Sequence, residues 1–486
     1  MPIKDVDFGR LDAEAEINLA DYFVDTGVLD KLRSGRKQYV MGRKGSGKTA
    51  LFKLANRSAL GHPVIAMEFS DYPWEAHKQI REAEVTAESA FVTSWRFTIF
   101  AAICRHWVDI ADAEVRKRAQ GYVGAIYGAD DPGVLEMVVD RLKRLRKIEL
   151  PSVEGVAGLG GFELGPAGEG PALARSLSQW CRILQDFVAE NYREFPVTVT
   201  LDRLDEGWDA TEESKMLMAG ALKAARDVNL RLACSESPAA VITFLRSDIY
   251  NELSFNDKNK INSDIEFLDW NEDALVDVAE ARIARSLACD KKGAWARVFS
   301  SDEMRQRASI RSYILKRTML RPRDMIAFCL HCQEVAGTED ADIVETSHVY
   351  RAEEKYSHHI YDELDDEMHK QVPEARAILQ AVREMGSTRF TFADWMGTFR
   401  RRNESGGDAN ARRWLRVLFD YSIVGVQKRG GVTRGTAFRF IYNDRLLEPN
   451  FDGEMIVHGS LTKYLSLRAP RRMRTTGVDT GRLELE

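Results

Sequence analysis

The chain has 486 residues, of which 44% are hydrophobic and 30% charged, and its formal net charge is −6. This length exceeds what one hydrophobic core can bury, so we expect roughly two to four domains with the composition of an ordinary soluble protein. No apolar run approaches the roughly 18 residues that a membrane helix needs, and the start is too acidic and polar for a signal peptide, so we expect a cytoplasmic protein with no membrane partner.

The first predicted element is a short buried strand at residues 37–41, followed by a glycine-rich loop and a helix. The loop, residues 42–49, reads GRKGSGKT and matches the pattern GxxxxGK[ST] at every fixed position. Glycines reach backbone conformations that are closed to other residues, so successive N–H groups can converge on a phosphate at a helix N-terminus. The alternative is a glycine-rich turn without a ligand, but the flanking strand and helix favour a phosphate loop.

The same pattern predicts roles for individual residues. We expect Lys48 to bridge the β- and γ-phosphates of a nucleotide, and the Thr49 hydroxyl to bind Mg²⁺. The expected ligands are therefore ATP and Mg²⁺. The predicted nucleotide-binding residues of the loop are Gly42, Arg43, Lys44, Gly45, Ser46, Gly47, Lys48, Thr49 and Ala50.

A strand is predicted at residues 62–70, and the segment of about 72–172 is longer than such a core needs, so we interpret it as a helical insertion. Its clearest feature is a set of apolar residues at helical spacing, which we expect to face the core or a partner. These residues are Phe91, Trp95, Ile99, Ala102, His106 and Ile110, and we expect His106 to be a buried histidine with its hydrogen bonds satisfied.

An ATPase also needs a carboxylate that holds the metal, usually at the end of a neighbouring apolar strand. Residues 197–201 alternate β-branched side chains and precede Asp202, which we predict to be that carboxylate. Arg203 follows, where many ATPases of the additional-strand class have the glutamate that polarises the attacking water. Asp205 or Glu206 must then take that role, or hydrolysis is slow. Alternatively, both acids belong to a capped turn before the next helix.

A further strand, residues 241–245, ends in Arg246. A polar residue at the tip of a strand beside the metal strand is well placed to sense the γ-phosphate, so we predict this role for Arg246. The alternative is a structural ion pair with Asp248 or with the cluster of Asp257 and Lys258.

Residues 264–270 form the last predicted strand, and a helical lid follows it. Within the lid, Pro322 favours the first turn of a helix, which puts Arg323 on the N-terminal turn. We predict that Arg323 contacts the nucleotide from there. Pairing of Arg323 with Asp324 or Glu334 is the alternative.

The last part of the chain is basic. Residues 371–486 contain 20 Lys and Arg against 13 Asp and Glu, a net charge of +7, which leaves −13 for residues 1–370. Helices predicted at 373–385, 392–402 and 408–421, followed by two alternating segments around a glycine turn, are typical of a winged helix.

The third of these helices has a basic face opposite an apolar face. In DNA-binding winged helices this helix enters the major groove and the wing contacts phosphate. The predicted residues for contact with double-stranded DNA are Arg412, Arg413, Arg416, Lys428, Arg429 and Arg434. The alternatives are a structural arm and a surface that binds acidic neighbours.

The motifs GRKGSGKT, LDRLDE, FLRSD, LDW and RPRD together resemble AAA+-related signal-transduction ATPases of the STAND and KAP-like groups. They resemble still more closely a bacterial P-loop ATPase family in which GRKGSGKT, an LDxLDE-like acid strand and FLRSDIY recur. The likeness spans roughly residues 21–330. It implies that Arg246 acts as a sensor, that Arg323 contacts nucleotide from the lid, and that the protein is a switch ATPase connected with mobile elements or antiphage defence. Arg203 departs from the usual pattern and argues against rapid hydrolysis.

We therefore predict an α/β fold: a parallel-sheet P-loop NTPase core with a helical insertion (1–270), a helical lid (271–370), a C-terminal winged helix (371–460) and a basic tail (461–486). One predicted function is an ATP-driven switch that forms a homo-oligomer and binds DNA. The other is a regulatory scaffold that holds ATP without turnover and docks an effector protein through its C-terminal domain.

Overall fold

A computed structural model of the chain describes residues 3–70, 87–127, 171–233, 238–369, 371–403, 406–427 and 438–469. The chain divides into two compact units. The sheet unit comprises Asp7–Ala294 and Arg321–Ile326, and the C-terminal unit comprises Met1–Val6, Trp295–Leu320 and Ala327–Glu486. None of the described helices is both long and apolar enough to span a bilayer. The domain boundaries expected from the sequence stay predictions.

The sheet unit is built on a parallel sheet whose strands lie in the order β2-β3-β4-β1-β5. The strands are β1 (Tyr39–Gly42), β2 (Val64–Glu68), β3 (Thr198–Asp202), β4 (Val241–Arg246) and β5 (Ile265–Phe267). Each of them overlaps a strand predicted from the sequence. Strand β4 lies between β1, which precedes the glycine loop, and β3, which ends in Asp202. The predicted α/β fold with a parallel sheet is confirmed.

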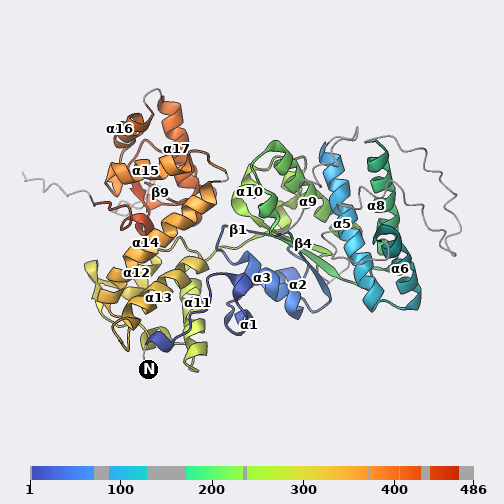
Figure 1. Cartoon of the computed structure of the whole chain (residues 1–486), viewed down its shortest axis with the longest axis horizontal. Coiled ribbons are helices and arrows are strands. Elements are labelled where there is room, and N and C mark those ends of the chain that lie inside the picture. The colour runs from blue at the N-terminus through green and yellow to red at the C-terminus, as the bar shows by residue number, and fades with distance from the viewer. Residues whose placement is uncertain are drawn as a thin grey trace, which may run out of the picture. The chain divides into compact units, whose positions relative to one another are not determined.

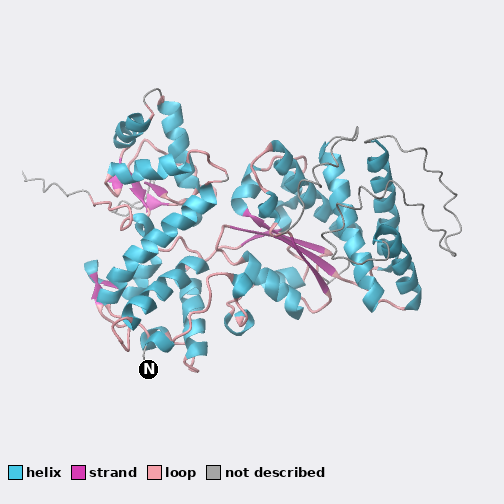
Figure 2. Ribbon diagram, in the orientation of Figure 1, coloured by secondary structure: helices cyan, strands magenta, loops and turns pink. Residues whose placement is uncertain are grey.

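The two faces of this sheet are covered by different helices (Figures 1 and 2). Because strand residues alternate in direction, neighbouring residues enter different cores. Met41 of β1 belongs to the core on the side of α9 and α10, whereas Val40 packs with residues of α2 and α3 on the other side. The helices of this unit are α1 (Leu19–Tyr22), α2 (Val28–Arg33), α3 (Lys48–Leu54), α5 (Ala87–Ile110), α6 (Ala113–Tyr127), α8 (Pro171–Asn191), α9 (Glu212–Arg231), α10 (Ser247–Glu252) and α11 (Glu272–Ser286).

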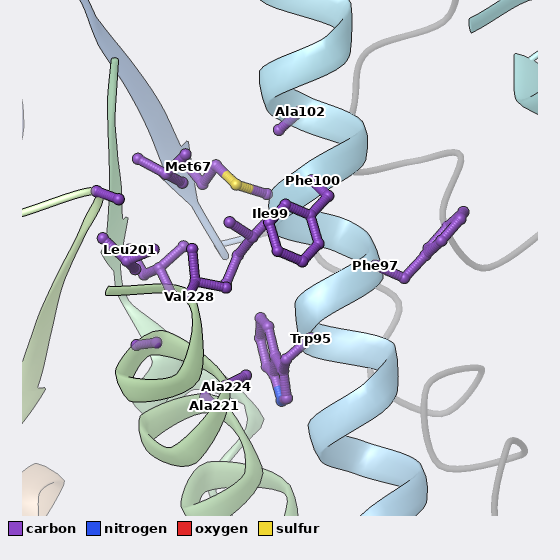
Figure 3. Close-up of a cluster of buried hydrophobic side chains, with 14 of the residues drawn as sticks. Met67, Trp95, Phe97, Ile99, Phe100, Ala102, Leu201, Ala221, Ala224 and Val228 are labelled. Carbon is purple, nitrogen blue, oxygen red and sulfur yellow. The ribbon is translucent and has the colours of Figure 1, made fainter. Parts of the chain in front are cut away.

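Helix α5 contributes a whole apolar face to the larger core. Figure 3 shows Trp95 and Ile99 of α5 pointing toward α9 and toward Met67 and Leu201 of the sheet. The indole N–H of Trp95 donates to the Leu217 carbonyl oxygen at 3.0 Å, which satisfies its one polar atom. Of the six residues predicted at helical spacing, Phe91, Trp95, Ile99 and Ala102 are buried in this core. The prediction was wrong at the end of the helix, where His106 is only partly buried and Ile110 is 41% exposed. Most of the remaining predicted insertion lies outside the described residues.

The C-terminal unit combines helices with a small antiparallel sheet. Its helices are α12 (Ile310–Leu315), α13 (Pro322–Gly337), which begins in the sheet unit, α14 (Thr346–Met368), α15 (Ala375–Met385), α16 (Phe392–Arg402) and α17 (Asp408–Asp420). Its strands are β6 (Glu303–Met304), β7 (Ala308–Ser309), β8 (Arg389–Phe390), β9 (Val424–Gln427), β10 (Phe438–Arg439) and β11 (Met455–Val457).

The sheet beside α15 to α17 differs from the two-stranded ribbon expected from the sequence. It has four strands in the order β10-β9-β11-β8, all antiparallel. Strands β8 and β11 are two and three residues long, so they carry no alternating pattern that reveals them in the sequence. The winged-helix assignment itself stays a prediction.

Candidate functional site

The glycine loop connects β1 to α3 and folds around its own lysine. Lys48 Nζ donates to the carbonyl oxygens of Gly42 and Arg43, at 3.0 and 3.1 Å. Gly47 has a φ of +96°, which strains any residue with a Cβ, and a Cβ at Gly42 would lie 2.3 Å from Ser46 Oγ. The loop conformation therefore depends on glycine at these positions. It holds the Lys48 ammonium against carbonyl acceptors that a phosphate can replace.

Asp202 ends β3 and is only 2% exposed. Hydrogen bonding from the Thr49 hydroxyl and the Arg203 backbone N–H lowers the pKa of this carboxyl group, and its Oδ2 atom is buried with no hydrogen-bond partner among the described residues. Burial raises the pKa of Asp202 to about 6, and the nearby Lys48 ammonium opposes this shift. The fold thus brings together the two segments that the sequence analysis assigned to one site.

These two side chains fit a magnesium site. A hydroxyl and a carboxylate are the oxygen donors that Mg²⁺ prefers, and the buried Oδ2 of Asp202 lacks any other partner. Thr49 is the second residue of α3, and Asp202 is the last residue of β3. Both therefore lie where the strands of the sheet have their carboxyl ends, which we call the carboxyl edge. This edge is where open parallel sheets bind their ligands.

Charged side chains surround Lys48. Burial lowers the pKa of Lys48, Asp205, Asp202 and Asp248 oppose that shift, and Arg246 adds to it. The acids that oppose the shift come from β3, from the turn after it and from α10. Lys48 is half-buried and lines a pocket, so an anion can reach it.

Arg246 lies at the end of β4, where its register partner is Gly42 of the loop. Its guanidinium binds both carboxylate oxygens of Asp248, at 2.6 and 3.2 Å, and its Nη1 lies 3.8 Å from Asp205 Oδ2. The ion pair of Arg246 with Asp248, predicted as the alternative to a sensor role, is therefore present. Arg246 also lies beside the glycine loop, where a γ-phosphate sensor would lie. The sensor role stays a prediction.

Arg203 follows Asp202 in a left-handed conformation, with φ 60° and ψ 28°. Its guanidinium pairs with Glu14 at 2.7 Å and with Glu206 at 3.5 Å. Glu206 and Asp205 lie on a short 3-10 turn (Leu204–Gly207), so each of the two acids predicted to polarise water lies beside an arginine. Their role in turnover stays a prediction.

The turn that begins α13 lies against the glycine loop within the sheet unit. The Arg323 backbone N–H donates to the Gly45 carbonyl oxygen at 3.4 Å, and its Nη2 lies 3.5 Å from Asp12 Oδ1. Arg321, to which the sequence analysis gave no role, is 2% exposed and pairs with Asp324 at 2.9 Å. Asp324, which the sequence suggested as a partner of Arg323, thus pairs with Arg321.

Sequence reasoning also missed the N-terminal segment of this unit. The Glu14 carboxylate forms an ion pair with Arg203, and the Glu14 backbone carbonyl accepts a hydrogen bond from Lys53 of α3. Together with the loop and the start of α13, this segment lines a pocket over Lys48 and Thr49. Its lining comprises Arg10, Leu11, Ala13, Glu14, Glu16, Leu19, Gly45, Gly47, Lys48, Thr49, Ala50, Arg282, Pro322, Arg323 and Ile326. Nothing in the local pattern of residues 10–19 signals this position.

Trp270 is a second missed residue. Its indole N–H donates to the Ser46 carbonyl oxygen at 2.8 Å, and its ring lies 3.9 Å from where a Cβ at Gly47 would be. Trp270 follows β5, so its place beside the loop results from the pairing of β5 with β1. The motif LDW marked the residue in the sequence but not its contact.

The predicted DNA-binding arginines of α17 all engage acids of the C-terminal unit. Arg412 lies 3.0 Å from Asp452, Arg413 lies 2.5 Å from Glu374, and Arg416 binds Asp420 and Glu448 at 2.9 and 3.1 Å. Their side chains remain about half exposed, between 45% and 51%. The predicted wing residues Lys428, Arg429 and Arg434 lie outside the described residues.

Comparisons with known proteins cover part of the chain. The family described as the FunZ-associated C-terminal helical domain matches residues 273–365, which fall in the region predicted as a helical lid. None of the curated proteins matches the sequence. Among solved structures, the chain is similar to Cdc6p from Pyrobaculum aerophilum, with 11% identity and a TM-score of 0.28 over 90% of this chain and 91% of that chain. A likeness this low carries no information on activity.

Proposed function

We propose that the protein is a Mg²⁺-dependent ATPase that acts as a molecular switch and engages DNA through its C-terminal unit. The observation that carries the proposal is the meeting of Lys48 and Thr49 with Asp202 at the carboxyl edge of the parallel sheet. A glycine-rich turn without a ligand does not account for a buried carboxylate oxygen that has no partner among the described residues and lies near the half-buried Lys48.

Each residue then has a defined task. The loop amides hold the β-phosphate, Lys48 exchanges the Gly42 and Arg43 carbonyl oxygens for phosphate oxygens, and Thr49 and Asp202 hold Mg²⁺. The metal neutralises charge on the phosphates. Arg246 contacts the γ-phosphate, and Arg323 contacts the nucleotide from the lid. Each arginine gives up an acidic partner when it binds the nucleotide. This exchange makes the lid sensitive to nucleotide state.

The alternative function has specific support. Arg203 occupies the position after the metal carboxylate, which favours slow turnover, and the α17 arginines already bind carboxylates, which favours an acidic protein surface over DNA. In that case the protein is a scaffold that holds ATP and docks an effector protein. A role in antiphage defence and assembly as a homo-oligomer belong to either proposal, and both rest on the resemblance of the motifs alone.

The deciding experiment measures phosphate release and nucleotide affinity for the wild type and Lys48→Ala, with and without duplex DNA. We expect Lys48→Ala to weaken nucleotide binding and to reduce turnover by about 100-fold or more, because the lysine stabilises charge that develops on the phosphates. DNA-stimulated turnover that the variant loses supports the switch. Tight ATP retention without turnover supports the scaffold, and equal nucleotide binding by both proteins contradicts both proposals.

A further inference from the structure

Glu68 is an acid at the carboxyl edge of the sheet to which no role has been given so far. It is the last residue of β2, and its register partner across the parallel pair is Asp202. Neighbouring strands lie about 4.8 Å apart, and residues paired in register point to the same face of a sheet. Glu68 therefore lies directly beside the proposed metal carboxylate and on the same side.

The residues on either side of Glu68 fix its direction. Met67 and Phe69 both belong to the core that α5 covers, and Figure 3 shows Met67 and Leu201 pointing toward that helix. The Phe69 ring lies 5.1 Å from the ring of Trp95, and the Phe69 N–H donates to the Asp202 carbonyl oxygen at 3.2 Å. Because side chains alternate along a strand, Glu68 is held on the opposite face, which carries α3 and Thr49.

Glu68 also differs from its acidic neighbours in its contacts. The other acids near Asp202 already have arginine partners: Glu14 and Glu206 with Arg203, and Asp205 with Arg246. Among the residues that the structure describes, none forms a side-chain hydrogen bond or ion pair with Glu68, which is half-buried. Its charge helps to raise the pKa of Arg203, the residue that follows Asp202. Because it is half-buried and has no such partner, the Glu68 carboxylate is open to a water molecule.

We propose that Glu68 is the catalytic base that activates the attacking water, in place of the glutamate that Arg203 replaces. The water gives one proton to the Glu68 carboxylate, and its oxygen forms a bond to the terminal phosphorus of ATP. The bond between that phosphorus and the bridging oxygen breaks, which leaves ADP and inorganic phosphate, and the proton passes from Glu68 to solvent. This inference rests on the proposed ATPase function.

The test compares Glu68→Gln with the wild type in steady-state phosphate release and in the affinity for a non-hydrolysable ATP analogue. We expect kcat to fall roughly 100-fold or more with the analogue affinity nearly unchanged, because a general base acts on the chemical step. Glu266→Gln is the matched control. Glu266 is also a strand glutamate, but it lies on β5, the outer strand on the other side of the sheet from β2, and pairs with Lys31, so its substitution should leave kcat unchanged. Glu68→Ala should regain part of its turnover when formate is added, because formate can replace the missing carboxylate. A purely structural role of Glu68 would not predict this rescue.

Three results overturn the inference. If Glu68→Gln keeps its kcat while the wild type turns ATP over, Glu68 is not the base and the ATPase proposal survives. If Asp205→Asn or Glu206→Gln abolishes turnover and Glu68→Gln does not, the base lies on the turn after β3. If the wild type shows no turnover that Lys48→Ala removes, the proposed hydrolysis fails first and the role of Glu68 fails with it.

Discussion

The carboxyl edge of the parallel sheet and the arginine face of α17 both concentrate charge, but they satisfy it in different ways. Among the residues that the structure describes, Asp202 has a buried oxygen without a hydrogen-bond partner, and Lys48 donates hydrogen bonds to carbonyl oxygens of its own loop. On α17, Arg412, Arg413 and Arg416 each hold carboxylates near the surface.

This difference separates a site that is incomplete from a surface that is already neutralised. A buried polar atom without a partner is destabilising, so a bound cation at Asp202 would remove that cost. Exposed ion pairs contribute about 0–1 kcal/mol each, so they are neither evidence for a ligand nor a strong barrier against one. The α17 arginines can therefore exchange their carboxylate partners for phosphates or for an acidic protein surface with little loss of stability.

The largest expected effect comes from Asp202→Asn. We expect Mg²⁺-dependent phosphate release to fall by about 100-fold or more, because the amide removes the charge that holds the metal near the developing phosphate charge. Asp264→Asn is the matched control, since Asp264 precedes β5 at the opposite end of the same sheet. Equal turnover by Asp202→Asn and the wild type would show that the sheet edge is not the incomplete site described above.

The second prediction concerns α17. Reversal of two charges, Arg412→Glu with Arg416→Glu, should reduce the affinity for duplex DNA by at least about tenfold and leave ATP binding unchanged, because phosphate contacts dominate such affinities. Removal of the competing acids, Asp452→Asn with Glu448→Gln, should raise DNA affinity instead. Fluorescence anisotropy at fixed salt measures both changes, and Arg376→Glu on α15 is a control for charge alone. If neither pair of substitutions alters DNA affinity, the α17 surface binds something other than DNA.

A smaller effect is expected on stability. Asp202 has its pKa raised to about 6 from 3.8, so the folded chain binds the proton more tightly than the unfolded chain does, and stability falls as pH rises between these values. At pH 7.5 the charged group destabilises the nucleotide-free protein by up to about 3 kcal/mol, from a shift of about 2 units at 1.36 kcal/mol each. Asp202→Asn should therefore melt several degrees higher at pH 7.5, and the difference should disappear near pH 4. Thermal denaturation at both pH values checks this, and a lower melting temperature for Asp202→Asn at pH 7.5 contradicts it.

The sequence alone determined the elements that depend on neighbouring residues. The loop at Gly42–Thr49 has its glycines and lysine within eight positions, and the strand before Asp202 is revealed by its alternation, so both were identified by pattern. The parallel sheet followed, because buried strands separated by helices can pair in few ways. Asp202 could be singled out because it comes at the end of such a strand.

Only the tertiary structure decided which distant side chains meet. Glu68 lies beside Asp202 because β2 pairs with β3, Trp270 reaches the loop because β5 pairs with β1, and Glu14 meets Arg203 through a segment with no periodic pattern. Three of the acids that neutralise α17, Glu374, Glu448 and Asp452, likewise lie outside this helix, whereas Asp420 is its own last residue. Local patterns record how a segment buries its own apolar side chains, whereas a contact between segments depends on register and packing that no single segment contains.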